Sequence, residues 1–142
     1  MPWLPDVNIW LALSLPGHVH HVAADQWFTS IDRSAYFCRA SEQGLLRLLT
    51  TSAVMTPYNL SALSNRKALQ HLNGFHSLDR VLFAREPESI NAHWHKLADA
   101  NTASPKLWMD AYLAAFAITG GFRLVTTDKA FKQFKGLNPL VL

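Results

Sequence analysis

Apolar residues follow two patterns along this chain: short unbroken runs, and longer stretches with one apolar stripe at helical spacing. The short runs predict buried strands and the stripes predict helices. The predicted strands cover residues 2–6, 35–38, 80–84, 122–126 and 140–142. The predicted helices cover residues 7–13, 18–31, 42–50, 59–72, 87–100, 105–119 and 129–134. Strands that alternate with helices predict an α/β fold built on a mainly parallel sheet.

Several polar and small residues stand where helices are expected to begin or end. Ser41 is a candidate N-cap for the third predicted helix. Asn73-Gly74 is expected to end the helix 59–72. Ser104 is expected to cap the helix 105–119, with Pro105 in its first turn and Gly120-Gly121 as its stop.

The helix 105–119 is apolar nearly all round, which is typical of a buried helix. Asp110 lies inside it, and Asp128 follows the strand 122–126 directly. A buried carboxylate is costly unless a cation or hydrogen bonds compensate its charge. This conflict between an apolar helix and a fixed negative charge indicates a functional site.

Length and composition bound the architecture. The chain has 142 residues, of which 49% are hydrophobic and 16% charged, so we expect one globular domain spanning residues 1–142. The net charge of +3 is compatible with nucleic-acid binding without establishing it. The one cysteine, Cys38, is expected to be a buried free thiol, because a single thiol cannot form an internal disulfide.

No apolar run approaches the roughly 18 residues of a membrane span. The first residues, Met-Pro-Trp-Leu-Pro-Asp, lack the basic and apolar regions of a signal peptide. We therefore expect a cytoplasmic protein without a membrane partner.

Four of the ten carboxylates lie in apolar or strand-end surroundings: Asp6, Glu42, Asp110 and Asp128. Asp6 and Asp128 follow strands, and Glu42 begins the helix after one. Because functional groups gather at the carboxyl ends of parallel strands, we expect these acids on one edge of the sheet. Taken singly, Glu42 and Asp128 are more simply interpreted as helix caps.

Four carboxylates cannot share a small site in ionised form unless a cation offsets their repulsion. Mg²⁺ or Mn²⁺ accepts such oxygen ligands together with water and phosphate. That combination suits the hydrolysis of phosphodiester bonds, because a bound ion activates water and offsets transition-state charge.

Four segments carry a resemblance to a known family. They are Asp6–Leu13, Phe37–Thr50, Trp108–Ala117 and Leu124–Phe131. Each resembles one motif of the PIN-domain nucleases and holds an acid at the expected place. Their order and spacing resemble the ribonuclease toxins of bacterial VapBC toxin–antitoxin pairs. The resemblance covers nearly the whole chain and is weakest over residues 55–100.

The resemblance implies a PIN-like fold in a single domain and a metal-dependent endoribonuclease that acts as a type II toxin. It implies that Asp6, Glu42 and Asp110 hold Mg²⁺ or Mn²⁺, and that Asp128 is the fourth acid, in contact with the metal directly or through water. Asn8 and Thr126 match polar positions that support the acids, a role that hydrogen bonds fulfil. The implied partners are an RNA substrate, a small cognate antitoxin and a second copy of the chain.

Two rival functions stay open. The first is a catalytically silent PIN-like module that binds RNA or protein, which the presence of all four acids disfavours. The second is a phosphatase with Asp6 as nucleophile. Such an enzyme typically needs a second acid two residues later, where this chain has Asn8.

Aromatic and basic residues near the acid motifs have a structural and a functional interpretation. Trp10, Trp27, Trp94 and Trp108 are expected in the core rather than as platforms for nucleobases. The basic side chains that flank the acids could neutralise phosphates or simply face solvent. These are Arg39, Arg47, Lys106 and Lys129.

Overall fold

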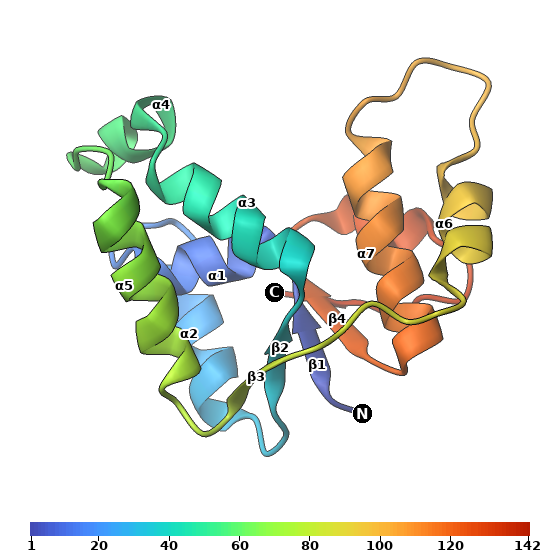
Figure 1. Cartoon of the computed structure of the whole chain (residues 1–142), viewed down its shortest axis with the longest axis horizontal. Helices are drawn as coiled ribbons and strands as arrows, with labels where there is room; N and C mark the ends of the chain where they lie inside the picture. Colours follow the sequence, from blue (N-terminus) through green and yellow to red (C-terminus); the bar gives the residue numbers. More distant parts are fainter.

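The computed structural model describes all 142 residues and contains a five-stranded sheet in which every neighbouring pair is parallel (Figure 1). The strand order is β3-β2-β1-β4-β5. The strands are β1 (Trp3–Pro5), β2 (Ala35–Phe37), β3 (Val81–Phe83), β4 (Arg123–Thr126) and β5 (Leu140–Val141). The predicted α/β fold with a mainly parallel sheet is therefore confirmed.

Helices cover both faces of the sheet, with α6 and α7 on one side and α1, α2, α3 and α5 on the other (Figure 1). The α-helices are α1 (Val7–Ser14), α2 (His21–Ser30), α3 (Arg39–Leu49), α4 (Ser52–Met55), α5 (Asn65–His76), α6 (Ile90–Ala98) and α7 (Leu107–Gly120). Two short 3₁₀ helices complete the fold, η1 (Thr56–Tyr58) and η2 (Lys129–Gln133).

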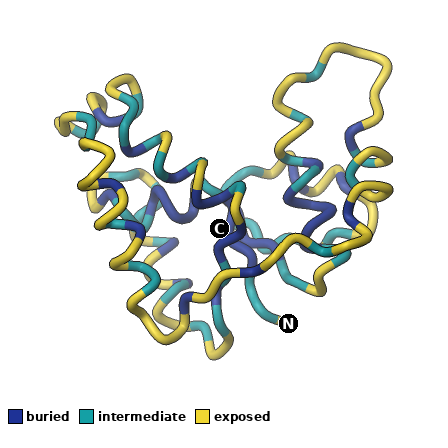
Figure 2. The backbone as a smooth tube through the Cα atoms, viewed as in Figure 1, coloured by how far each residue is buried: buried dark blue, intermediate teal, exposed yellow.

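Successive residues of a strand pack alternately into two separate hydrophobic cores, one on each face of the sheet. Leu124 packs into the core beneath α6 and α7, whereas the next residue, Val125, packs into the core beneath α1, α3 and α5. Tyr36 and Phe37 divide in the same way on β2. Because side chains alternate between faces along a strand, a sheet covered on both faces needs apolar residues at every position. Figure 2 shows buried backbone at the centre of the molecule, between the helical layers, whereas the edge strand β3 is largely exposed.

The central strand β1 marks the point where the strand order of the sheet reverses. The chain adds β2 and β3 on one side of β1 and then returns to add β4 and β5 on the other. Loops that follow β1 and β4 therefore leave the sheet toward opposite faces. Crevices at such switch points are where open α/β sheets bind ligands.

The prediction of a helix over residues 59–72 is wrong at both ends. Asn59 adopts φ 58°, a left-handed conformation that ends η1. The helix α5 begins only at Asn65, where the Ser64 hydroxyl accepts a hydrogen bond from the Lys67 N–H. It then continues through Gly74 to His76, because an exposed helical glycine costs only about 1 kcal/mol and the flanking residues pack against α3.

Two predicted caps are also wrong. Helix α3 begins at Arg39, so Ser41 lies inside the first turn, where its hydroxyl accepts from the Cys38 N–H. Helix α7 begins at Leu107, and the preceding Ser104 and its neighbours form a turn rather than a cap. The predicted stop of α7 is confirmed, since Gly121 adopts φ 75° at its end.

Two other expectations concern burial. Cys38 is free and fully buried, as predicted. The middle of the apolar helix α7 is buried as well, since Leu113, Phe116 and the alanines between them are shielded from solvent, but its first turn is exposed at Trp108 and Met109. None of the helices combines the length and the apolarity that crossing a membrane requires.

Candidate functional site

Asp6 occupies the switch point directly after β1. Its backbone N–H still donates to the Val125 carbonyl of β4 at 2.9 Å, so the residue is anchored between the two central strands. Its carboxylate caps α1 by accepting from the Val7 N–H at 2.7 Å. The residue is only 7% exposed, and burial raises the pKa of the Asp6 carboxyl to about 6.

Thr126 connects Asp6 with Asp128. The buried Thr126 hydroxyl donates to Asp6 Oδ2 at 3.0 Å and accepts from the Asp128 N–H at 3.0 Å. One side chain at the end of β4 thus sets the orientation of one acid and the backbone position of another. The structure places Thr126 where a residue that supports the acids should lie.

Asp128 has two partners of its own. Its Oδ1 accepts from the Ala130 N–H at 2.9 Å and so caps η2, while its Oδ2 lies 2.8 Å from Lys106 Nζ. The Lys106 hydrogen bond, followed by that of Ala130, lowers the pKa of the Asp128 carboxyl. The helix-cap interpretation of Asp128 is therefore correct, and it coexists with a place in the acid cluster.

Asp110 lies in the first turn of α7, partly buried, in a hollow of about 310 Å³ that Lys106 and Ala130 also line. Burial raises the pKa of its carboxyl, the Lys106 ammonium opposes this shift, and the charge of Asp128 adds to it. No hydrogen bond holds the Asp110 carboxylate to another side chain. It is the least compensated acid of the site.

The three aspartates form one electrostatic unit. Both Asp110 and Asp128 raise the pKa of the Asp6 carboxyl through their negative charges, beyond the larger effect of burial. The Lys106 ammonium interacts with all three aspartates, most strongly with Asp128, and these charges raise the pKa of Lys106. We call Asp6, Asp110, Asp128 and Lys106 the aspartate cluster.

Glu42 lies on α3, in surroundings of a different kind. It is 7% exposed, and both of its carboxylate oxygens are engaged. Oε1 accepts from Arg39 Nη1 at 2.7 Å, and Oε2 lies 2.8 Å from His76 Nε2. The structure therefore holds Glu42 between Arg39 and His76, whereas Asp6, Asp110 and Asp128 interact electrostatically with one another.

The position of α3 depends on close packing against α1. A Cβ atom built on Gly44 would lie 2.8 Å from Val7 Cγ2, closer than real side chains approach. Glycine at this position therefore lets α3 approach α1, the helix that Asp6 caps. Glu42 is brought to the same end of the sheet as the aspartates by this contact.

Asn8 was expected to support the acids through hydrogen bonds, and the structure shows no such bond. The residue is exposed on α1, and no hydrogen bond joins its side chain to an acid. By contrast, His76 lies against Glu42 and was missed by sequence reasoning. The reason is the predicted helix end at Asn73-Gly74, which placed His76 in a loop rather than on a helix facing α3.

The chemistry of the acids fits a hard divalent cation. Asp6, Asp110 and Asp128 offer oxygen donors only. Burial and repulsion by neighbouring acids disfavour the charged forms of Asp6 and Asp110. Yet no three His, Cys, Asp or Glu side chains converge closely enough here to hold a metal ion. Arg39 and His76 at Glu42, and Lys106 at Asp128, compete with a metal ion for these carboxylate oxygens.

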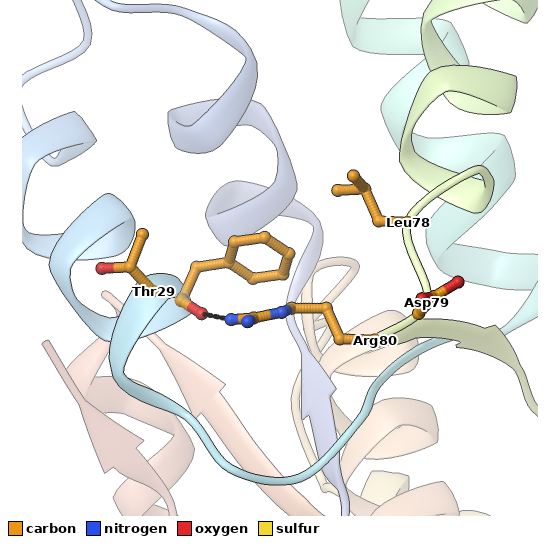
Figure 3. A pocket seen from close by; sticks show the side chains of 5 residues that line it. Thr29, Leu78, Asp79 and Arg80 are labelled. Carbon is orange, nitrogen blue, oxygen red and sulfur yellow. Dashed lines mark hydrogen bonds between the residues drawn. The ribbon is translucent and has the colours of Figure 1, made fainter.

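A larger hollow, of about 600 Å³, lies at the opposite edge of the sheet (Figure 3). Arg80 crosses it, and its guanidinium donates to the Phe28 carbonyl at 2.7 Å and lies over the Phe28 ring. The Asp79 side chain points away from that guanidinium (Figure 3). The Arg80 guanidinium of this hollow is already hydrogen-bonded to the Phe28 carbonyl, and no reactive groups converge there. Its larger size therefore does not make this hollow the functional site.

The expectation that four tryptophans lie in the core is correct for two of them. Trp10 and Trp27 are buried, whereas Trp94 is only partly covered. Trp108 is 58% exposed, which contradicts the prediction. It lies two residues before Asp110, and its ring contacts Trp94 of α6 edge to face.

Known proteins resemble this chain in sequence and in fold. A family model for the PIN domain matches residues 4–137. Ribonuclease VapC41 of Mycobacterium tuberculosis is 50% identical over 137 residues, which cover 94% of each chain. Ribonuclease VapC39 of the same organism is 32% identical over 132 residues, 92% of this chain and 91% of that protein.

Two solved structures share the fold at low sequence identity. VapBC2 from Rickettsia felis, bound to a DNA fragment from its promoter, matches with a TM-score of 0.69 at 14% identity, covering 100% of this chain and 99% of that one. The sarcin–ricin loop cleaving toxin VapC20 of M. tuberculosis matches with a TM-score of 0.66 at 16% identity, covering 96% and 99%.

Proposed function

This chain belongs to the VapC family of PIN-domain proteins, and from that premise we propose that it is an endoribonuclease acting as the toxin of a toxin–antitoxin pair. The observation that carries the proposal is the aspartate cluster. A carboxyl as buried as Asp6, whose pKa is raised by burial and by two further acids at the switch point of the sheet, is typical of a functional site.

Asp6, Asp110 and Glu42 would hold Mg²⁺ or Mn²⁺, and Asp128 would take part directly or through a water molecule. When bound, the ion supplies an activated water and offsets the negative charge that develops on an RNA phosphodiester during hydrolysis. The raised pKa of Asp6 and Asp110 supports this assignment, because a cation would remove the repulsion and burial cost that cause it.

The remaining residues of the cluster orient the acids. Thr126 and the Val7 N–H hold the two oxygens of Asp6, so this carboxylate cannot rotate away from the site. Lys106 holds Asp128 and is 75% exposed in its side chain. An exposed ammonium beside the acids can attract the RNA phosphate into a site that is otherwise negative.

The proposed partners follow from the relatives. The fold is shared with a VapBC2 complex bound to promoter DNA, which supports a small cognate antitoxin as the protein partner of this chain. Pairing with a second copy of the chain, which the sequence resemblance implies, remains part of this proposal. The relatives named as ribonucleases support RNA as the substrate.

The test is cleavage of RNA by the purified protein in Mg²⁺, compared with the same reaction in EDTA. Asp6→Ala and Asp110→Ala are each expected to abolish metal-dependent cleavage while circular dichroism shows an unchanged fold. Asp25→Ala, an exposed carboxylate on α2, is the matched control and is expected to cleave normally. Full cleavage by both active-site variants would refute the mechanism.

A catalytically silent module remains the second candidate, because one observation favours it. The side chains hold no ready-made set of three metal ligands, and both Glu42 and Asp128 are already paired with cationic partners. Calorimetric titration with Mn²⁺ separates the two functions. Binding that is lost in Asp110→Ala supports the enzyme, whereas no binding to the unaltered protein supports the silent module.

A further inference from the structure

An apolar hollow of about 320 Å³ opens beside the aspartate cluster. Three of its lining residues are aromatic and three are apolar without an aromatic ring: Trp94, Trp108, Tyr112, Ala40, Pro105 and Met109. Trp108 and Met109 are 58% and 46% exposed, so the hollow presents apolar surface to solvent. We call it the aromatic hollow.

Two of the three aromatic side chains of the hollow, Trp94 and Tyr112, are held by hydrogen bonds. Trp94 Nε1 donates to the Trp108 carbonyl at 3.0 Å, and the Tyr112 hydroxyl donates to Glu86 at 2.6 Å. Trp94 also contacts Tyr112 edge to face, with ring centroids 5.7 Å apart. The polar ends of both side chains are therefore satisfied, and the two rings form a fixed wall beside the exposed Trp108.

The aromatic hollow adjoins the aspartate cluster. Pro105 lines both the aromatic hollow and the hollow that holds Asp110 and Lys106. Ala40 extends it to the start of α3, next to Arg39. The side chains of Arg39 and Lys106 are 70% and 75% exposed, so solvent-accessible cations lie at both ends of this apolar surface.

We propose that the aromatic hollow binds a nucleobase of single-stranded RNA, with Trp108 as its stacking platform, beside the phosphodiester that the acids hydrolyse. The proposal rests on the proposed function and deepens it. Proteins that bind single strands combine cations for the backbone with aromatic surfaces for the bases, and here both occur within a few residues of Asp110. An unstacked base would cover the apolar surface while its phosphate lies toward Lys106.

Size and charge favour a base over a second copy of the chain. A stable protein interface buries about 800 Å² on each partner, which requires a broad surface rather than a small hollow. A second copy that docked by the same face would also bring its own Arg39 and Lys106 against these cations. An RNA strand instead carries the negative charges that they attract.

Binding is best measured without hydrolysis, by fluorescence anisotropy of labelled single-stranded RNA decamers of A, C or U in EDTA. Trp108→Ala is expected to weaken binding of at least one decamer about tenfold. Trp108→Phe should restore most of the affinity, because it keeps a stacking surface. Leu69→Ala, a similarly exposed apolar residue on α5, is the matched control and should bind as the unaltered protein does.

Inorganic polyphosphate of similar length separates base stacking from charge. Its affinity is expected to be unchanged in Trp108→Ala, because it has no bases, and reduced in Lys106→Met. Equal decamer affinity in Trp108→Ala, in Met109→Ala and in the unaltered protein would overturn the proposal. A protein dimer that dissociates in Trp108→Ala while RNA affinity stays constant would assign the surface to a second copy and overturn it as well.

These readouts distinguish the inference from the function on which it rests. If the unaltered protein cleaves RNA while Trp108→Ala neither binds decamers more weakly nor cleaves with a higher KM, only the inference fails. If the unaltered protein cleaves no RNA, the proposed function fails, whatever the binding of decamers shows.

Discussion

The aspartate cluster and the surroundings of Glu42 solve the same electrostatic problem in opposite ways. Three carboxylates in the cluster share one lysine, and the pKa of two of them is raised. Glu42 has a guanidinium and an imidazole to itself, one on each oxygen. Both regions lie at the carboxyl end of the sheet, so the difference arises from the side chains around them.

The comparison indicates that the two regions differ in how strongly they would bind a metal ion. The aspartate cluster has an excess of negative charge, and a divalent cation would gain most of its binding free energy there. The Glu42 carboxylate already has Arg39 and His76 as partners, so a metal ion would have to compete with them for its oxygens. Each prediction below tests one side of this contrast.

The largest expected effect is on metal binding by the two regions. Asp110→Asn is expected to lower RNA cleavage at least about 100-fold and to weaken Mn²⁺ binding at least tenfold more than Glu42→Gln does. The reason is that Asp110 has no competing hydrogen bond, whereas Glu42 must first leave its partners. Calorimetry with Mn²⁺ measures the binding ratio.

Asp99→Asn, which removes an exposed carboxylate at the end of α6, is the control for this comparison and should change neither quantity. Equal losses of Mn²⁺ affinity in Asp110→Asn and Glu42→Gln would show that the two acids bind metal alike. The contrast between the two regions would then have no functional meaning.

The next effect is a pH dependence of stability that arises from Asp6. Its carboxyl has a pKa of about 6 in the folded protein, against 3.8 as the unperturbed value. Folding therefore favours the protonated form, and this stabilisation is present at low pH and lost as the pH rises through about 6. In EDTA, the free energy of unfolding should fall by on the order of 2–3 kcal/mol between about pH 4 and pH 7.

Urea denaturation at several pH values measures this effect. Asp6→Asn should flatten the pH dependence, because the variant has no proton to bind, whereas Asp25→Asn on α2 should leave it unchanged. Mg²⁺ should stabilise the unaltered protein more at pH 7 than at pH 4. A pH profile that is the same in Asp6→Asn and in the unaltered protein would show that the Asp6 proton does not contribute.

A smaller effect is expected at Glu42. His76→Ala removes the partner of one buried oxygen and should lower the free energy of unfolding by about 1 kcal/mol, as measured by urea denaturation. His93→Ala, an exposed histidine on α6, is the control. A larger loss in His93→Ala than in His76→Ala would contradict the assignment of His76 as the partner that compensates Glu42.

The smallest effect concerns Lys106. Lys106→Met removes the one cation of the aspartate cluster, so Mn²⁺ should bind about two- to fivefold more tightly than to the unaltered protein. The change is small because the lysine side chain is largely exposed to solvent. Lys67→Met on α5 is the control, and unchanged or weaker Mn²⁺ binding in Lys106→Met would show that the lysine does not compete with the metal.

Much of the fold could be predicted from local pattern, and the errors have identifiable causes. The prediction of a helix over residues 59–72 depended on apolar spacing alone and on Asn73-Gly74 as a stop. Tertiary packing of α5 against α3 overrode both signals, because contacts with the core outweigh the propensity of one glycine. Trp108 was misplaced for a related reason, since apolarity does not show which side of a helix meets the core.

The candidate site shows the same limit. The four acids could be found because each interrupts an apolar pattern or follows a strand. Their partners could not, since Lys106 and Asp128 lie far apart in sequence, as do His76 and Glu42. Ion pairs of this kind depend on how helices are placed, and a linear pattern carries no record of that placement.

The alternation of strands and helices, the end of the sheet where the acids gather and the family of the chain all follow from apolar periodicity and motif order. These are local properties of the chain. The shared lysine of the three aspartates, the separate partners of Glu42 and the exposure of Trp108 became apparent only from the folded molecule. Charge compensation and exposure depend on which distant residues come within a few ångströms, and folding alone sets those distances.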